Sequence, residues 1–412
     1  MSFTPSVPAY LAPLLSLFAS HGEAAYPVGG CVRDTLMDIP PHDWDVAVTT
    51  IPHDTMAICH AAGYRTVPTG LKHGTVTVLA PLSGDPQDRE GAYEMIECTT
   101  CRTEGGYTDG RHPDAVAFTG LIEDDLSRRD FTVNAMAARL TESGDFEIVD
   151  LFGGEQDLAD GVIRCVGDPD TRFEEDSLRV LRAVRFAVKL GFDIEPRTLA
   201  ALRRQGAGLA RLSRERISVE FRKILCSPEP ARGVQLLWAT GLLPYVLPRG
   251  ISPDGTGDLS ALPADLATRA ACLLWQQEPD ALSENLAGLR LPTDTVRRIT
   301  TMALADPALD ETPPNARLWR HDYGELALPL AAVLSAHGKD TSRLGELIRA
   351  SEQSGDCVRT SELAVNGRDL TALVGVSGRR IGELLDELLR LVLDDPRKNN
   401  REILLDEARK RI

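Results

Sequence analysis

The chain has 412 residues, which is too long for one ordinary hydrophobic core and predicts two to four domains. No apolar run reaches the ~18 residues that a membrane-spanning helix needs. No basic segment precedes the first charged residue, Glu23, so we expect neither a membrane protein nor a signal peptide. The net charge of −16 argues against nucleic-acid binding over the whole surface. Eight cysteines without disulfide-framework spacing predict a cytoplasmic protein.

Residues 1–150 are typical of a mixed α/β domain. Short runs rich in apolar and β-branched residues alternate there with turns and helical stretches. Residues 31–37 predict a short helix directly after a turn at Gly29 and Gly30. The expected strands are 25–28, 44–48, 75–79, 93–99 and 146–150.

From residue 151 onward apolar residues recur at helical spacing, and we expect a neck (151–225), a body (226–355) and a tail (356–412). The neck is locally basic, with 13 Lys and Arg against 7 Asp and Glu between Arg172 and Lys223. Such a segment can bind RNA phosphates, or it can be an ordinary arginine-rich helical face. The expected helices are 174–190, 196–209, 217–225, 231–239, 266–276, 293–305 and 326–336, with further helices after 360.

The first chemical motif is a Gly-Gly turn followed by two aspartates separated by one residue. Alternation along a strand puts both carboxylates on one side, where two hard oxygen ligands suit Mg²⁺. The turn lets a triphosphate approach backbone N–H groups at a helix start. Alone, each feature is typical of an ordinary turn or a solvated strand end; together they predict a metal-dependent nucleotidyl-transfer site. Its candidate residues are Gly29, Gly30, Arg33, Asp34, Asp43 and Asp45.

The second motif, residues 128–136, reads RRDFTVNAM. Arg128 and Arg129 can bind triphosphate oxygens bidentately. Asp130 and Asn134 can orient these arginines or bond a ribose. From this motif alone, a capped helix start with a surface arginine pair is the alternative.

The third motif, residues 174–186, reads EEDSLRVLRAVRF. Asp176, Arg179, Arg182 and Arg185 recur every three residues, so neighbours share a face of a continuous helix. A weak intrahelical salt-bridge ladder is one interpretation. In the other, aspartate accepts and arginine donates hydrogen bonds, a pattern that matches the Watson–Crick edges of cytosine and adenine but not of uracil and guanine. Arg182 and Arg185 would then support this pair or hold phosphate.

Three other features leave alternatives open. Residues 102–114, which include Arg111 and several glycines, predict either a functional loop or a plain surface loop. His73 either assists the chemistry or belongs to a strand turn. The His321-Asp322 dipeptide has no His and Asp cluster around it, so we expect no phosphohydrolase (HD) metal site.

In this order the three motifs resemble the signature of polymerase-β-like nucleotidyltransferases, in the bacterial class II branch of tRNA nucleotidyltransferases (CCA-adding enzymes) and poly(A) polymerases. The likeness is most specific within residues 26–225 and diffuse after them. It implies an α+β multidomain fold: a polymerase-β-like α/β head at 1–150, then an all-α neck, body and tail without an HD domain. It also implies that Arg129 contacts the nucleotide and that the 102–114 loop serves addition of the last A.

The resemblance implies a tRNA 3′-terminal nucleotidyltransferase that adds CCA from CTP and ATP without a nucleic-acid template. Asp43 and Asp45 would hold Mg²⁺, and Gly30, Arg33 and Arg129 would hold the phosphates. Asp176 and Arg179 would select the base. The body and tail would bind the acceptor–TΨC half of tRNA, and no protein partner is predicted. The alternatives are an enzyme that adds only the terminal A, a poly(A) polymerase, and an RNA-binding helical protein with a relict head.

Overall fold

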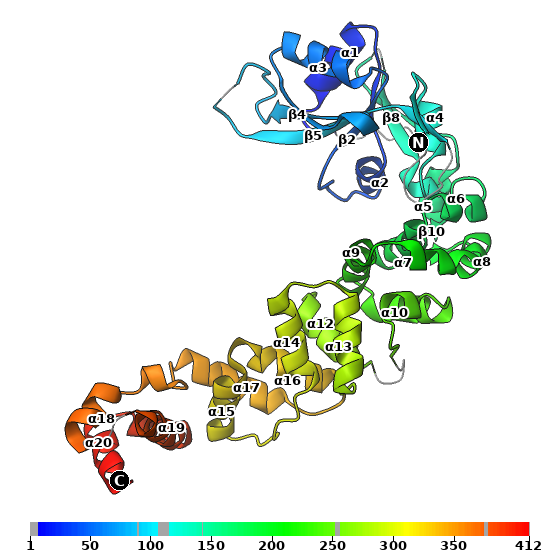
Figure 1. Ribbon diagram of the computed structural model, residues 1–412. Coiled ribbons are helices and arrows are strands. Elements are labelled where there is room, and N and C mark those ends of the chain that lie inside the picture. Colours follow the sequence, from blue (N-terminus) through cyan, green and yellow to red (C-terminus); the bar gives the residue numbers. More distant parts are fainter. Residues whose placement is uncertain are drawn as a thin grey trace. The chain divides into compact units, whose positions relative to one another are not determined.

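The computed structural model describes residues 7–88, 90–105, 115–141, 143–251, 256–374 and 378–411 (Figure 1). The chain divides into two compact units. Unit 1 comprises Met1–Ile224 and Leu236–Tyr245, and unit 2 comprises Leu225–Gln235 and Val246–Ile412. The expected division into head, neck, body and tail stays a prediction. Within the described ranges, no helix is long and apolar enough to cross a membrane.

A five-stranded mixed sheet organises the first part of unit 1, in the order β1-β2-β5-β4-β3. The β2–β5 pair is parallel, and the other pairs are antiparallel. The four strands expected from alternation within residues 25–99 are all present; β3, whose Pro68 weakens the strand signal, was not expected. The bounds are β1 Ala25–Pro27, β2 Asp45–Val48, β3 Arg65–Gly70, β4 Thr75–Pro81 and β5 Tyr93–Thr100.

One face of this sheet is covered by α1 (Ala12–Ser20) and α3 (Pro52–Ala61) (Figure 1). Val46, Val78 and Ile96 point into the core beneath these helices, together with Phe18. Because side chains alternate along a strand, the odd-numbered residues of β2, β4 and β5 lie on the opposite face. That face carries Asp45.

A second, two-stranded sheet is linked to the first sheet by an isolated β-bridge between Val28 and Ala137. The expected strand at 146–150 is β9, and it pairs antiparallel with β8, which follows the RRDFTVNAM motif. The remaining elements here are α2 Gly30–Leu36, the hairpin β6 Arg102–Gly105 and β7 Ala115–Phe118, α4 Ile122–Ser127, a 3-10 turn Thr132–Asn134, β8 Met136–Leu140, β9 Phe146–Asp150 and α5 Gly154–Asp160.

The segment from 151 to 225 was expected to be entirely helical, but it also contains two short strands. Val162–Ile163 (β10) and Asp193–Ile194 (β11) form a short parallel pair, which is too brief to leave an alternation signal. The helices are α6 Pro169–Glu175, α7 Leu178–Leu190, α8 Pro196–Gln205 and α9 Arg214–Leu225, with a 3-10 segment Gly206–Arg211.

The expected continuous helix 174–190 is wrong. The chain breaks between α6 and α7, because Asp176 has an extended backbone (φ −138°, ψ 103°). Its carboxylate accepts the backbone N–H of Leu178 at 3.0 Å. Aspartate competes for backbone donors in this way and favours helix starts over helix interiors. Asp176 therefore does not share a helix face with the three arginines.

Helices make up the ordered secondary structure of the rest of the described chain. Five of the expected helices correspond to α9, α10, α12, α14 and α16, and the tail is helical as expected. Those bounds are α10 Pro230–Ala239, α11 Leu243–Val246, α12 Leu266–Leu273, α13 Pro279–Gly288, α14 Thr293–Ala303, α15 Pro313–Tyr323, α16 Ala327–Ala336, α17 Ser342–Gln353, α18 Gly367–Val374, α19 Arg379–Asp394 and α20 Arg401–Lys410.

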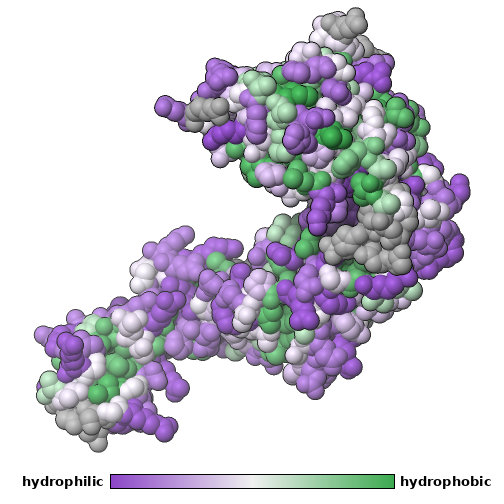
Figure 2. Space-filling view, turned by 45° about the horizontal axis from the view of Figure 1, so that its top comes forward, coloured by the Kyte–Doolittle hydropathy of each residue, from purple (hydrophilic) through white to green (hydrophobic). Residues whose placement is uncertain are grey.

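Hydrophilic and hydrophobic residues are interspersed over the face seen in Figure 2. Buried aliphatic side chains hold the last three helices together: Leu384, Leu388 and Val392 of α19 pack with Leu370 of α18 and Leu404 of α20. The long helix α19 presents these residues at helical spacing, as the sequence predicts for an amphipathic helix.

Candidate active site

A polar cavity of about 540 Å³ in unit 1 brings the three motifs together. It is lined by seven arginines and one lysine against four aspartates, so its wall is strongly cationic. All of the predicted site residues line it except Asp34 and Arg111. The lining residues are Gly29, Gly30, Arg33, Asp43, Asp45, Arg128, Arg129, Asp130, Asn134, Asp176, Leu178, Arg179, Arg182, Arg185, Phe186, Lys189 and Arg216.

Both the backbone conformation and the available space require a glycine at position 29. Gly29 has φ +75°, a conformation that L side chains rarely adopt. A Cβ at this position would lie 2.6 Å from Nη1 of Arg129. Gly30 then begins α2, whose first N–H groups have no partner within the helix. The turn therefore lets the backbone N–H groups at the start of α2 and the guanidinium of Arg129 reach the same region of the cavity.

Asp43 and Asp45 both face the cavity, with the buried Trp44 between them. Asp43 lies just before β2 rather than within it, because the strand begins at Asp45. Burial, then the charges of Asp43 and Glu97, raise the pKa of Asp45 to about 6. The two carboxylates are thus held together against their mutual repulsion.

Glu97 is a carboxylate that the sequence motifs did not indicate. It lies directly opposite Asp45 in the parallel β2–β5 register, so its charge acts on Asp45. Its sequence signal was weak, because β5 carries two acidic residues, Glu94 and Glu97, and nothing in the alternation marks one of them as part of a site. Within the described residues, however, no three side chains of His, Cys, Asp or Glu converge to hold a metal ion.

Asp125 orients the arginine pair and was also missed. It is 1% exposed, and its two oxygens accept from Arg128 Nη2 at 2.5 Å and Arg129 Nη2 at 2.9 Å. Burial would raise the pKa of Asp125, but Arg129 and Arg128 hold it below its ordinary value. The spacing of Asp125 to the two arginines, three and four residues along a helical end, was the available sequence signal.

Asp130 and Asn134 orient other cations. Nε of Arg182 donates to Asp130 Oδ2 at 2.7 Å, and the Asn134 amide donates to Oδ1 at 3.2 Å. Arg33 donates in turn to the Asn134 oxygen. Burial would raise the pKa of Asp130, but Arg182 and Arg179 hold it at about 2. The alternative of a capped helix start is not observed, because no side chain caps the 3-10 turn that follows.

Asp176 and Arg179 both line the cavity but do not pair with each other. Nη2 of Arg216 donates to both oxygens of Asp176, at 3.2 and 3.0 Å. Arg179 donates to Glu175 at 2.8 Å and to the carbonyl of Arg128 at 2.9 Å. The intrahelical ladder, one of the two interpretations of this motif, is therefore not observed between the side chains of Asp176 and Arg179. Arg216 itself was missed; its Nη1 is buried without a hydrogen-bond partner.

Arg185 and Phe186 form the inner wall. Nε of Arg185 donates to the buried Glu220 at 2.5 Å. Its guanidinium lies 4.0 Å from the centroid of the Phe186 ring, and those of Arg33 and Arg182 lie 5.4 and 5.3 Å from it. The π-face of one phenylalanine thus sits among three cations, an arrangement that favours holding them together.

The other predicted residues have different surroundings. Asp34 does not line the cavity; it accepts from Arg33 Nε at 2.8 Å and so orients that arginine. Arg111 lies outside the described residues. His73 ends a short exposed 3-10 turn, Leu71–His73, outside the cavity. His321 is exposed, and its Nδ1 contacts the carbonyl of Val358 at 2.8 Å.

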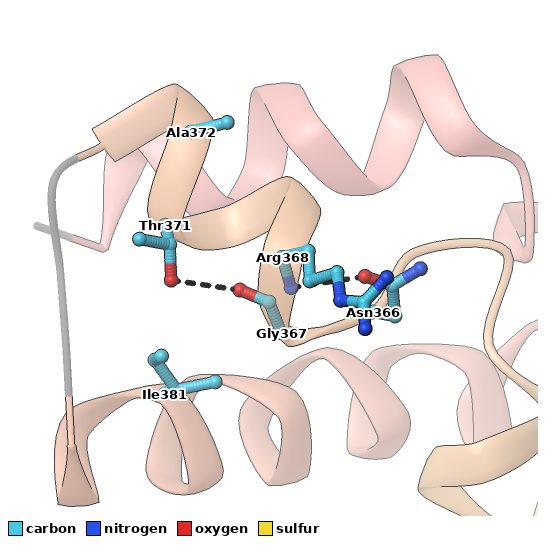
Figure 3. A pocket seen from close by; sticks show the side chains of 6 residues that line it. All are labelled: Asn366, Gly367, Arg368, Thr371, Ala372 and Ile381. Atoms are coloured by element: carbon cyan, nitrogen blue, oxygen red, sulfur yellow. Dashed lines mark hydrogen bonds between the residues drawn. The ribbon is translucent and has the colours of Figure 1, made fainter.

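A larger cavity, of about 760 Å³, lies in the tail between α18 and α19 (Figure 3). Asn366, Gly367, Arg368, Thr371 and Ala372 form one side, and Ile381 forms the other. Its lining contains one charged group, Arg368, and no carboxylate. It has no carboxylate that could hold a metal ion and only a single arginine, whereas the smaller polar cavity combines four aspartates with seven arginines and is therefore the candidate active site.

The raised pKa of Asp45 predicts an effect on stability. The pKa of Asp45 is 3.8 ordinarily and about 6 in the folded protein. Above pH 6 the carboxylate is charged in both states, and its charge then destabilises the folded state. The destabilisation fades as pH falls from 6 to 3.8, where both states are protonated. In EDTA-treated protein, Asp45→Asn should raise the thermal midpoint at pH 7.5, and the gain should shrink towards pH 4.

The matched control for this measurement is Asp54→Asn, which changes an exposed aspartate at the start of α3. Its thermal midpoint should follow that of the wild type across the pH series. A midpoint for Asp45→Asn below the wild-type value at pH 7.5 would contradict the prediction.

Three family models match successive parts of the chain. Residues 25–164 match the poly A polymerase head domain, residues 191–251 the RNA and SrmB-binding site of polymerase A, and residues 266–408 tRNA nucleotidyltransferase domain 2.

Individual relatives match over nearly the full length. The chain is 36% identical to the CCA-adding enzyme of Limosilactobacillus fermentum, covering 96% of this chain and 95% of the relative. The Bacillus stearothermophilus CCA-adding enzyme, solved in complex with CTP, matches with a TM-score of 0.79 and 33% identity over 98% of both chains. The Thermotoga maritima CCA-adding enzyme, solved with tRNA, shares the fold, with a TM-score of 0.72 and 22% identity over 97% of this chain and 94% of that one. The chain therefore belongs to the class II family of CCA-adding enzymes.

Proposed function

We propose that this protein adds C, C and A to the 3′ end of tRNA, using CTP and ATP and no nucleic-acid template. The single observation that carries the proposal is the cavity in which a carboxylate pair meets a cationic wall. This is the charge pattern that a metal-bound triphosphate needs. The near-complete match to CCA-adding enzymes supports tRNA as the acceptor.

The residues present fit Mg²⁺. Asp43 and Asp45 supply two hard oxygen ligands, and Mg²⁺ keeps its other positions for water and phosphate. The raised pKa of Asp45 is what a carboxylate pair awaiting a cation exhibits. When bound, the ion polarises the phosphate and lowers the pKa of the attacking hydroxyl. Glu97, opposite Asp45, adds negative charge to the same side.

The remaining wall residues would bind and orient the nucleotide. Arg33, Arg128 and Arg129 would hold the triphosphate, with Gly30 offering its backbone N–H. The 3′-oxygen of tRNA would attack the α-phosphorus, and the bond to pyrophosphate would break in line with it. Asp125 and Asp34 keep the arginine forks in place and so hold the triphosphate for this step.

Base choice would rest on Asp176 and Arg179. The Asp176 carboxylate retains accepting capacity beyond Arg216 and Leu178, and Arg179 presents donors at the same cavity wall. Arg216 is a positioning residue here, because it holds the Asp176 oxygens. Arg182 and Arg185, tied to Asp130 and Glu220, would support this wall.

We also propose that the chain consists of a head (1–150), a neck (151–225), a body (226–355) and a tail (356–412). The body and tail would bind the acceptor–TΨC half of tRNA through shape and phosphate contacts. No disulfide joins any of the described cysteines, which supports a cytoplasmic location.

The first prediction concerns which nucleotides are added. Three tRNAs, ending at the discriminator base, at C and at CC, are incubated with labelled CTP and ATP. The wild type should extend all three to CCA. Extension of only the CC-ended tRNA would make the protein an A-adding enzyme, and long A tails would make it a poly(A) polymerase.

The second prediction concerns the carboxylate pair. Asp43→Ala and Asp45→Ala should each abolish nucleotide addition but leave tRNA affinity near the wild-type value, because these groups hold cations rather than RNA. Mg²⁺ should raise the thermal midpoint of the wild type and not of either variant. Asp54→Ala is the control and should behave as wild type; wild-type turnover in either site variant would refute the assignment.

The third prediction concerns base choice. Asp176→Ala should relax discrimination against UTP and GTP, and Arg179→Ala should weaken the use of both CTP and ATP. Each lost contact should cost about 1–3 kcal/mol in kcat/KM. Because Asp176 also caps α7, the control is Asp168→Ala, which removes the cap of α6 outside the cavity. Equal NTP preference in all three variants would assign Asp176 and Arg179 to structure alone.

A further inference from the structure

On the face of the head sheet that carries Asp45, some apolar side chains of β5 and β3 are exposed, and the proposed function does not use them. Met95 is 63% exposed, Tyr93 46% and Val67 43%, although each lies within a strand. The guanidinium of Arg65 lies 4.9 Å from the centroid of the Tyr93 ring. Soluble proteins rarely leave such side chains side by side without a use.

The strand registers place these residues on the face that carries the catalytic carboxylate. Asp45 is opposite Glu97, Glu97 is opposite Thr77, and Thr77 is opposite Val67. The next row along β5 and β4 contains Met95 opposite Leu79, followed by Tyr93 opposite Pro81. Side chains two residues apart on a strand share a face and stand about 7 Å apart. Met95 and Tyr93 therefore extend in two steps away from Glu97.

The sheet order separates this apolar surface from the cationic cavity. Gly29, Gly30 and Arg33 follow β1, at one edge of the order β1-β2-β5-β4-β3, whereas Val67 lies on β3 at the other edge. Asp45 on β2 stands between them. Arg128 and Arg129 also reach β5 at Glu97 and Thr99, so the apolar surface begins on the other side of Glu97, at Met95.

The geometry of phosphoryl transfer assigns one substrate to each side. The attacking and leaving oxygens lie roughly in line on opposite sides of the phosphorus. The pyrophosphate needs the cationic side, so the attacking 3′-oxygen has to arrive from over β5 and β4. The nucleotides that carry this oxygen are unpaired, and unpaired bases stack on exposed aromatic and apolar side chains.

We propose that Tyr93, Met95 and Val67, with Arg65, form a stacking track for the unpaired 3′-terminal nucleotides of the tRNA acceptor. The inference rests on the proposed function for the identity of the RNA. Continuity with Asp45 selects this occupant over a second copy of the chain pairing along the edge strand β3. Bases of any identity stack, so the track holds the 3′ end equally before each addition.

The test uses the full chain and a tRNA with 2-aminopurine in place of its unpaired discriminator base. Binding to the wild type should quench the fluorescence, because stacking quenches this base. Tyr93→Ser and Met95→Ser should lose most of the quench, and Tyr93→Phe, which keeps the ring, should retain it. Ile51→Ser, an equally exposed apolar residue at the start of α3, is the matched control and should retain the quench.

Kinetics provide the second readout. Stacking contributes equally before and during the reaction, so Tyr93→Ser should raise the KM for tRNA by about five- to hundredfold and leave kcat and the KM for CTP and ATP unchanged. Full quenching in Tyr93→Ser and Met95→Ser would overturn the proposal. So would a wild-type dimer that dissociates in Tyr93→Ser without a change in quenching.

The two proposals fail separately. The quench needs no turnover, so it decides the stacking track even for a protein that adds no nucleotides. CCA addition by the wild type decides the proposed function and is independent of the fluorescence result.

Discussion

Seven arginines and a lysine can lie around one cavity only because carboxylates form salt bridges with most of the arginines. Asp125 binds two arginines at once, and Asp130, Asp176 and Glu220 bind one each. Removing one partner of such a buried pair leaves an uncompensated charge, which costs several kcal/mol. The arginine forks are thereby set before any triphosphate arrives, which lowers the ordering cost of binding.

At Asp43 and Asp45, by contrast, like charges lie close together. These carboxylates are crowded by each other and by Glu97, and Arg129 only partly offsets the repulsion. The protein keeps a locally unfavourable arrangement at the point where a cation is proposed to bind. Stability sacrificed at a functional site in this way is a common feature of enzymes. The cationic wall and the anionic pair give the cavity two parts of opposite charge, which we propose to bind phosphate and metal respectively.

The break between α6 and α7 determines how the two residues proposed for base choice are held. If residues 174–190 formed one helix, the Asp176 side chain would lie on the helical surface beside Arg179. The extended backbone at Asp176 instead turns its carboxylate to cap α7 and meet Arg216. Asp176 and Arg179 therefore remain separate groups on one wall, each held by a different partner. The proposed template for C and A is built from this separation.

The sequence by itself determined the elements and the chemistry that depend on local pattern. Alternation identified β2, β4 and β5, the turn glycines identified the start of α2, and residue types at fixed spacing identified 13 of the 17 residues that line the cavity. It misplaced Asp176 on a helix, because a side chain that competes for backbone N–H groups leaves no periodic signal. Only the tertiary structure decided the partners. Glu97, Arg216 and Glu220 come from strands and helices whose pairing depends on long-range register and packing, which sequence spacing does not encode. Asp125 differs from them, because it precedes its two arginines by three and four residues.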